Sequence, residues 1–299
     1  MNLVLIDGDI IVYEAAYCVE GKEKDGVYLT WYQVTKIVNT IVRTILLASK
    51  ATHHLGFLTE SKSNFRNKRA TTLPYKGQRK TNREKPKFYS EVRDYLQSHF
   101  GFQMMRGVEA DDALTIASEH FKGNPKVRTT IATKDKDLWQ YAGHHYNMNT
   151  KELMEITPEE AHKNLWRQMI LGDLGTDNIP GLSHSNKWEI VFKDEEASKK
   201  FRGIPCHQFG KVRAEKILDE TPPEEYAKVI FDLYIDSYGW EDEHDEDFGE
   251  YRFYETYDLI FMLLESPKDL KIHFNPVKVR GTDVEYDDDF DGFRPNLEF

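Results

Sequence analysis

Three acidic residues fall within four positions at Glu109, Asp111 and Asp112, immediately before apolar residues at helical spacing. Like charges at this density repel one another unless a cation lies among them. A divalent cation is the natural partner, because hard cations prefer carboxylate oxygens. Acids are also favoured in the first turn of any helix, where they cap free N–H groups and oppose the helix dipole. This segment alone therefore leaves both explanations open.

Three further pairs of acids occur along the chain, at Asp7 and Asp9, at Asp135 and Asp137, and at Asp173 and Asp177. The first two pairs directly follow apolar, strand-like runs. In an α/β domain the carboxyl ends of parallel strands meet at one edge of the sheet, where ligands bind. We therefore expect the acidic clusters to converge in one cleft.

Strand-like and helix-like segments alternate along most of the chain. The predicted strands are 3–6, 54–58, 102–105 and 128–133, with a hairpin at 144–156. The predicted helices are 31–49, 87–99, 109–121, 158–171, 209–218, 223–237 and 250–264. This alternation predicts an α/β fold with a mainly parallel central sheet flanked by helices. We expect an α/β core over 1–171 and a helical region over 172–299, the latter with an inserted charged stretch at 183–205 and an acidic C-terminal part.

The charge of the chain is unevenly distributed. The net charge of −11 argues against a nucleic-acid binder that works by bulk electrostatics, but residues 60–93 carry eleven Lys or Arg and three acids. Residues 236–299 carry nineteen acids and six basic residues. The basic limb, residues 60–88, contains Phe65, Tyr75 and Phe88 among its cations, a composition that suits a single-strand groove, although a solvated surface would also explain it.

Other classes of protein are disfavoured by composition. The only two cysteines, Cys18 and Cys206, exclude a disulfide framework and disfavour a thiolate zinc site. No segment approaches the roughly 18 consecutive apolar residues of a membrane span, and the chain begins with a strand-like run without a basic leader. We therefore expect a cytoplasmic protein.

A pocket lined by carboxylates and few nitrogen ligands favours Mg²⁺ or Mn²⁺ over zinc. Two such ions about 4 Å apart can activate a water molecule and stabilise the leaving oxygen in phosphodiester cleavage. The basic limb would then hold the polyanion. These residues predict a metal-dependent enzyme that acts on nucleic acid.

Five motifs in this order resemble those of the 5′-nuclease (flap endonuclease) family, most closely the bacteriophage 5′→3′ exonucleases. They are Asp7 after the first strand, residues 75–79 (Tyr-Lys-Gly-Gln-Arg), residues 108–112 (Val-Glu-Ala-Asp-Asp), residues 133–137 (Thr-Lys-Asp-Lys-Asp), and Gly172-Asp173 with residues 177–181 (Asp-Asn-Ile-Pro-Gly). The resemblance spans residues 3–220. It implies a PIN-like core, a basic helical arch at 60–88 and a helix-turn-helix-like region that binds DNA.

The resemblance also implies roles for individual residues. Asp7 and Asp111 would bind one metal ion and Asp111, Asp135 and Asp137 a second, with support through water from Glu109, Asp112, Asp173 and Asp177. Lys76 would contact the scissile phosphate and Tyr75 would stack on a base. The other implied DNA contacts are Arg79, Lys80 and Arg83 in the arch and Lys211, Arg213 and Lys216 near the duplex.

The implied reaction is Mg²⁺-dependent or Mn²⁺-dependent hydrolysis near a DNA 5′ end, exonucleolytic or at a 5′ flap, by a monomer that functions in DNA replication. The resemblance extends to RNA–DNA hybrids as substrates and to a polymerase or single-strand-binding protein as partner. If the gene is carried by a bacteriophage, the protein would act in the host cytoplasm.

Three departures separate this chain from the family pattern. Thr59-Glu60 stands where an acid is expected after the second strand, which leaves the role of Glu60 open. The last two acids, Asp173 and Asp177, are four residues apart, whereas the family usually has a spacing of three residues between them. About 25 residues separate Gly181 from the Gly210 segment that resembles the second half of the duplex-gripping turn.

Two other classes of function fit some of the same residues. A haloacid-dehalogenase-type phosphatase would use Asp7 and Asp9, Thr59, and the Gly-Asp-x-x-x-Asp pattern at 172–177, but that pattern should follow a strand whereas residues 165–171 are predicted to be helical. A non-catalytic protein that binds branched DNA could use the same scaffold. The many acids disfavour it, because carboxylates near phosphates without a cation weaken binding.

Overall fold

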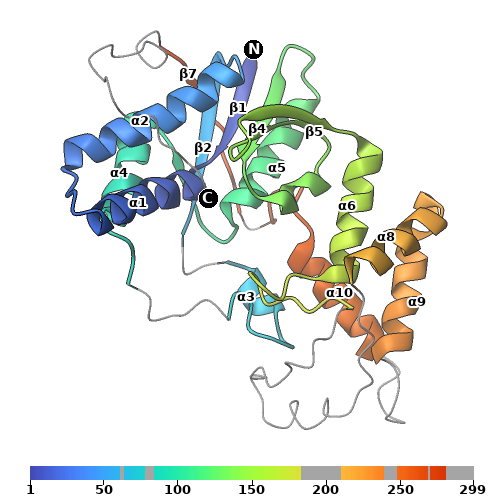
Figure 1. The fold of residues 1–299 in the computed structure, drawn as a ribbon. Helices are drawn as coiled ribbons and strands as arrows, with labels where there is room; N and C mark the ends of the chain where they lie inside the picture. The colour runs from blue at the N-terminus through green and yellow to red at the C-terminus, as the bar shows by residue number, and fades with distance from the viewer. Residues whose placement is uncertain (61–63, 78–83, 183–209, 239–247, 269, 281–299) are drawn as a thin grey trace.

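The computed structural model describes residues 1–60, 64–77, 84–182, 210–238, 248–268 and 270–280. At its centre is a sheet with strand order β3-β2-β1-β4-β5-β6, and β7 pairs with β2 (Figure 1). The strands are β1 (Asn2–Asp7), β2 (His53–Thr59), β3 (Gln103–Met105), β4 (Arg128–Thr133), β5 (Gly143–Asn147), β6 (Glu152–Ile156) and β7 (Val277–Lys278). Strands β1 to β5 pair in parallel, whereas β6 and β7 are antiparallel. The predicted mainly parallel sheet is confirmed.

Helices cover both faces of this sheet, because the apolar side chains of β1 point alternately to one face and to the other. Val4 and Ile6 pack into a cluster with α1 (Gly8–Lys24), α2 (Trp31–Ala48) and α4 (Tyr89–Phe100). Leu3 and Leu5 pack on the opposite face against α5 (Ala110–Lys122). Successive strand residues point to opposite faces, so a run of apolar residues indicates a strand that is buried on both sides.

Helix α1 was not among the predicted helices. Its buried residues include Ile10, Ile11, Val12, Ala15 and Ala16, which are too closely spaced to form a single apolar stripe. The helix packs against the sheet as well as α2 and α4. A helix surrounded on several sides loses the amphipathic signature by which helices are found in sequences.

The second group of helices gathers at one end of the sheet (Figure 1). It consists of α6 (Pro158–Leu171), α8 (Lys211–Glu220), the short 3-10 helix η2 (Pro223–Glu225), α9 (Tyr226–Tyr238) and α10 (Phe248–Ile260). Trp166 and Ile170 of α6 share one apolar cluster with Leu218, Ile230 and Phe253. The predicted domain boundary after residue 171 falls within the elements of this cluster, because α6 packs with the C-terminal helices.

The chain beyond α10 returns to the α/β core. The Thr115 hydroxyl of α5 donates to the Leu263 carbonyl at 2.6 Å, and β7 adds to the edge of β2. The predicted insertion at 183–205, and the end of the chain beyond residue 280, lie outside the described residues. Within the described chain, no helix is both long and apolar enough to cross a membrane.

Candidate active site

The carboxyl ends of β1 and β4 place three acids at one edge of the sheet. Asp7 caps α1 by accepting a hydrogen bond from the Ile10 amide at 3.3 Å, and its other oxygen accepts from the Thr133 hydroxyl at 3.3 Å. Asp135 begins the 3-10 helix η1 (Lys136–Gln140) and accepts from the Asp137 amide at 2.9 Å. The strand ends therefore orient these acids through local hydrogen bonds, as the sequence pattern predicted.

Burial and mutual repulsion raise the pKa values of several of these carboxyl groups. Burial, together with the charges of Asp9 and Asp135, raises the pKa of Asp7 to about 8. Asp137 is raised to about 8 by burial and by the charges of Asp135, Asp173 and Asp177. The negative charge at this edge is therefore poorly compensated by the protein itself.

Asp111 lies in the first turn of α5 and completes this group. Burial raises its pKa well above the usual value, and the charges of Asp7, Glu109 and Asp135 raise it further. The helix N-terminus partly offsets this cost through its dipole. Asp111 therefore joins the acids of β1 and β4, and the three predicted clusters meet.

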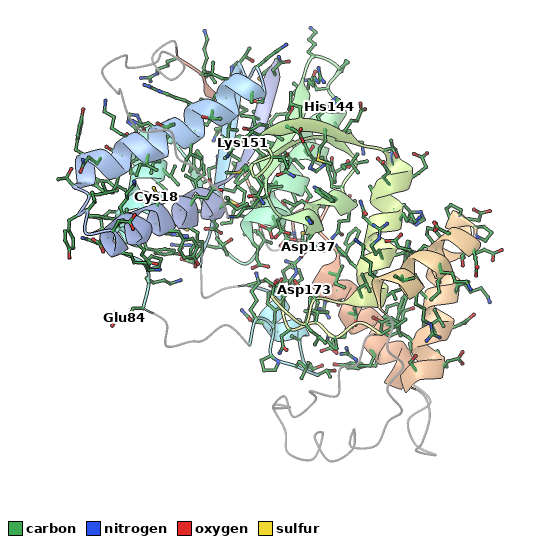
Figure 2. All side chains as sticks on the ribbon, in the orientation of Figure 1. Cys18, Glu84, Asp137, His144, Lys151 and Asp173 are labelled. Carbon is green, nitrogen blue, oxygen red and sulfur yellow. The ribbon has the colours of Figure 1, made fainter. Side chains whose placement is uncertain are left out.

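The fourth cluster lies on a sharply turned loop after α6. Gly172 and Gly181 both have positive φ, and a Cβ atom on Gly172 would lie 2.3 Å from the Ile179 carbonyl oxygen. Only glycine fits this close crossing of the backbone. The loop brings Asp173 beside Asp137 (Figure 2), and both line one pocket.

This pocket is lined by the acids Glu109, Asp111, Asp137, Asp173 and Asp177, together with Arg66, Tyr75, Gln168, Gly172, Ile179, Leu259, Ile260 and Met262. Its floor is formed partly by α6, which ends at Leu171. The Gly-Asp pattern at residue 172 therefore follows a helix, as predicted from the sequence, and this disfavours the phosphatase arrangement.

Lys76 and Tyr75 reach into the acidic pocket from the basic limb. The Lys76 ammonium forms an ion pair with Glu109 and lies 3.9 Å from an Asp177 oxygen. The Tyr75 hydroxyl, which has one proton to donate, lies 2.7 Å from a Glu109 oxygen and 2.9 Å from an Asp177 oxygen. Burial and the charges of Glu109 and Asp177 raise the pKa of Tyr75, so its phenol remains a donor.

The burial of Tyr75 bears on its predicted role, which is stacking on a DNA base. Its ring is 7% exposed and packs in the apolar cluster around α6. A ring held in this position has no free face on which a DNA base could stack. In this structure Tyr75 instead fixes the carboxylates of Glu109 and Asp177.

Asp112, for which the resemblance implies support of the metal through water, is held by an arginine in this structure. Its carboxylate is fully buried and forms a bidentate ion pair with Arg66 at 2.6 and 2.9 Å. The same oxygens accept from the backbone amides of Glu109 and Leu263 at 3.2 Å each. With both oxygens engaged, Asp112 is a structural carboxylate that holds the start of α5 to α3 (Arg66–Arg69).

Asp9 and Glu60 lie outside the pocket lining. Asp9 forms a 2.8 Å ion pair with Arg93 and accepts from the Thr59 amide at 3.0 Å. Glu60 forms a 3.2 Å ion pair with Arg106. The Thr59 hydroxyl accepts from the Ala110 amide at 2.9 Å, so this residue ties β2 to the start of α5.

The residues predicted to contact DNA are only partly within the described chain. Arg79, Lys80 and Arg83 fall in 78–83, outside the described residues. Lys211, Arg213 and Lys216 are all exposed on α8, and Lys216 lies 3.7 Å from Glu220. Helix α8 packs against α6 (Figure 1).

The donor set suits a hard divalent cation. Asp7, Asp111, Asp135 and Asp137 offer only oxygen atoms as ligands. The raised pKa values of Asp7, Asp111 and Asp137 indicate that a cation would stabilise their ionised forms. Within the described ranges, no three acidic, histidine or cysteine side chains are arranged to hold one ion together. Mg²⁺ is usually held by one or two carboxylates with waters completing its shell, so pairs from this group fit that mode of binding.

Three residues in or near the site, Arg66, Arg93 and Gln168, were not predicted from the sequence. Arg66 was one of eleven cations in the basic stretch, and Arg93 lies at the end of the same stretch. Gln168 donates to Asp137 at 3.0 Å from the inner face of α6. Nothing in their spacing distinguished them, because their partners are distant in sequence.

Comparisons with known proteins identify relatives of this chain. A family model described as the N-terminal resolvase-like domain of 5′-3′ exonucleases matches residues 2–166. A structure of a mutant 5′-exonuclease of bacteriophage T5 is 15% identical, covers 87% of this chain and 87% of that chain, and has a TM-score of 0.52. A T5 flap endonuclease in a pseudo-enzyme–product complex with DNA and metal ions is 15% identical, covers 86% of this chain and 100% of that chain, and has a TM-score of 0.48. No curated protein matches this chain.

Proposed function

We propose that this chain, which belongs to the 5′-3′ exonuclease family, is a divalent-metal-dependent nuclease that hydrolyses phosphodiesters near DNA 5′ ends, as an exonuclease and at 5′ flaps. The observation that carries this proposal is the cluster of buried carboxyl groups of Asp7, Asp111 and Asp137 at the carboxyl edge of the sheet, whose pKa values are raised by burial and mutual repulsion. A structural carboxylate cluster would be neutralised by fixed cations, as Asp112 is by Arg66. The products would be a 5′-phosphate and a 3′-hydroxyl.

We propose a two-ion arrangement in which Asp7 and Asp111 hold one Mg²⁺ or Mn²⁺, and the second ion lies among Asp111, Asp135 and Asp137, bound by pairs of these carboxylates with waters completing its shell. Bound ions would supply an activated water and neutralise charge at the leaving oxygen. The Thr133 hydroxyl orients Asp7, and Gln168 orients Asp137, which limits the reorganisation needed on binding.

Lys76 is the residue we expect to meet the scissile phosphate. Its ammonium already lies among Glu109 and Asp177 at the edge of the pocket, and its backbone has a φ of +56°, unusual for a residue with a side chain. Such strained conformations persist where the surrounding structure fixes them, and they cluster at functional sites. A lysine suits phosphate because it is a compact, strongly hydrated charge.

The proposal is tested with end-labelled 5′-flap DNA, blunt duplex DNA and a small phosphate monoester, each with Mg²⁺ and with EDTA. We expect cleavage of DNA 5′ ends only with Mg²⁺. Turnover of the monoester without DNA cleavage would indicate a phosphatase instead. Stable DNA binding without turnover of any substrate would indicate a non-catalytic binder.

A residue-level test compares Asp135→Asn with Glu60→Gln. Asp135→Asn should abolish cleavage and leave DNA binding largely intact, because it removes a charge that we assign to the metal site. Glu60→Gln removes a carboxylate that instead faces Arg106 and should remain active. Full activity of Asp135→Asn would refute the metal assignment, and loss of activity in Glu60→Gln would place Glu60 among the ligands.

We further propose that Lys211, Arg213 and Lys216 of α8 contact the duplex backbone. Their exposure on one short helix supports this assignment. Each phosphate contact that is lost should reduce the salt dependence of duplex binding by about 0.9 in log–log slope. An unchanged slope in a Lys211→Ala, Arg213→Ala double variant would exclude the contact.

A further inference from the structure

A set of aromatic side chains covers one side of the molecule, along α1 and the turn into α2. Four of them are substantially exposed: Tyr17 (45%), Tyr28 (74%), Trp31 (37%) and Tyr32 (67%). Partly buried rings adjoin them at Tyr13 of α1 and at Phe88 and Tyr89, where α4 begins. We call these seven residues the aromatic face.

Ring contacts join five of these residues into two groups, and Tyr28 and Tyr32 extend from the turn into α2. Tyr13 stacks on Tyr17 with centroids 6.1 Å apart and lies 5.5 Å from Tyr89. Trp31 lies 5.8 Å from Phe88, the residue that precedes Tyr89. The segment 84–88, which leads from the basic limb into α4, therefore lies along both groups.

Lysines from this same segment lie over the rings. The Lys85 ammonium is 4.4 Å from the centre of the Tyr89 ring, and Lys87 is 5.9 Å from that of Tyr28. Lys87 also forms an ion pair with Glu23. The lysines therefore contact both aromatic rings and a carboxylate. Exposed aromatic area, rather than net positive charge, distinguishes this surface.

The aromatic face borders the candidate active site through Asp9, which lies outside the pocket lining but acts electrostatically on Asp7. Arg93, which forms the 2.8 Å ion pair with Asp9 in the first turn of α1, also donates to the Tyr89 hydroxyl at 3.3 Å. Tyr13 lies one helical turn beyond Asp9, and Tyr17 one turn further. Figure 2 places Glu84, at the start of the segment 84–88, below α1. A strand leaving the site on the side of the basic limb would meet these rings.

The exposure of these rings is not explained by the fold. A tyrosine that is two-thirds exposed buries little apolar area, so Tyr28 and Tyr32 contribute little to the core. A contiguous exposed aromatic patch usually marks an interaction surface. Aromatic rings interspersed with lysines, next to a site that acts on DNA, are typical of surfaces on which unpaired bases stack.

We propose that the aromatic face binds the single-stranded 5′ segment of the substrate, chiefly by base stacking on Tyr17, Tyr28, Trp31 and Tyr32. This inference extends the proposed nuclease function and rests on it for the identity of the substrate. Lys85 and Lys87 would contact phosphates. Because only two lysines are involved, the log–log salt slope from this surface should be small, about −1.4 at −0.7 per phosphate.

The first test measures binding without catalysis. Oligothymidylate of about 16 nucleotides, the upper end of the site size of single-strand modules, is titrated in EDTA against the full chain, with anisotropy and tryptophan fluorescence as readouts. Stacking on Trp31 should quench fluorescence, and Trp31→Phe should remove most of that quenching. Quenching that is unchanged in Trp31→Phe would overturn the assignment of this ring.

The second variant removes the most exposed rings. Tyr28→Ala with Tyr32→Ala should weaken oligothymidylate binding by about 25-fold or more, since each of the two stacked bases contributes about fivefold or more. The matched control is Tyr254→Ala, a tyrosine of α10 that is 55% exposed and lies outside the face. Equal oligothymidylate binding by the double variant, by Tyr254→Ala and by the wild type would overturn the proposal. This is also the outcome expected if the aromatic face binds a protein partner instead of DNA.

Cleavage assays then separate this inference from the proposed function. KM is measured for a substrate with a flap of about 16 nucleotides and for one with a single-nucleotide flap. The ratio of long-flap to short-flap KM should rise in the Tyr28→Ala, Tyr32→Ala variant and stay at the wild-type value in Tyr254→Ala. A wild-type protein that cleaves neither substrate refutes the nuclease function, whereas cleavage with an unchanged KM ratio refutes only the aromatic face.

Discussion

Replacing Arg66 by methionine should destabilise the protein strongly, because this one side chain joins three separate parts of the structure. Its guanidinium is 1% exposed and forms the bidentate ion pair with Asp112 of α5. It also donates to the carbonyls of Leu259 and Phe261 at 2.9 and 3.0 Å, at the end of α10. Arg66→Met keeps much of the volume and removes every one of these bonds.

The expected magnitude follows from the charge that is left behind. Removing one partner of a fully buried ion pair typically costs about 3–5 kcal/mol, because the remaining carboxylate, here Asp112, stays desolvated without its cation. For a protein of this size each kcal/mol lowers the melting temperature by about 2–4 °C. We therefore expect Arg66→Met to lower it by about 10 °C.

The assay is urea and thermal denaturation of the full chain, followed by circular dichroism. The matched control is Arg69→Gln in the same helix, whose 3.6 Å ion pair with Asp258 is 67% and 45% exposed. Exposed pairs contribute about 0–1 kcal/mol, so this variant should melt close to the wild type. If Arg66→Met were no less stable than Arg69→Gln, the reasoning would be refuted.

A double variant tests the cause of the loss. Arg66→Met combined with Asp112→Leu removes both charges and should be more stable than Arg66→Met alone, since no buried carboxylate remains without a cation. If the two substitutions were simply additive, the loss would come from packing and from the carbonyl contacts rather than from the stranded charge.

The remaining predictions concern charge in and near the pocket. Asp111→Asn should raise the melting temperature of the metal-free protein and reduce the further rise on adding Mg²⁺, because one repelled carboxylate is gone; a fall in EDTA would contradict this. Lys76→Met should strengthen Mg²⁺ binding measured by calorimetry while reducing cleavage, because Glu109 loses its cation; weaker binding would contradict this. Burial raises the pKa of Glu255, but Arg252 and hydrogen bonds from the Thr71 and Thr72 segment outweigh it and hold the pKa below 4.5. The stability from this group is present above about pH 4.5 and is lost as the pH falls through the lower folded value, so denaturation midpoints measured from pH 6 to pH 3 should fall less in Glu255→Gln than in the wild type.

Much of the fold was predictable because its signals are local. The capping box at Thr157 and Glu160 located the start of α6, and the β-branched run at 128–133 located β4. The return of the chain to the core was not predictable. Strand β7 is two residues long, and its pairing with His53 and His54 is more than 200 positions distant in sequence, so no periodic pattern could reveal it.

The acids in and around the site are of two kinds, those with an arginine partner and those without one, and the two kinds look alike in the sequence. Asp9 and Asp112 carry fixed arginine partners, and those partners lie 84 and 46 positions away. Asp7, Asp111 and Asp137 have no ion-pair partner in the part of the chain that the structure describes, and burial together with repulsion raises their pKa values. Composition and spacing identify a carboxylate cluster, but only the tertiary structure shows which charges the protein has already neutralised. In the proposed two-ion arrangement the remaining carboxylates bind the cations, and Asp112, although adjacent to Asp111 in the sequence, belongs to the scaffold because Arg66 already neutralises it.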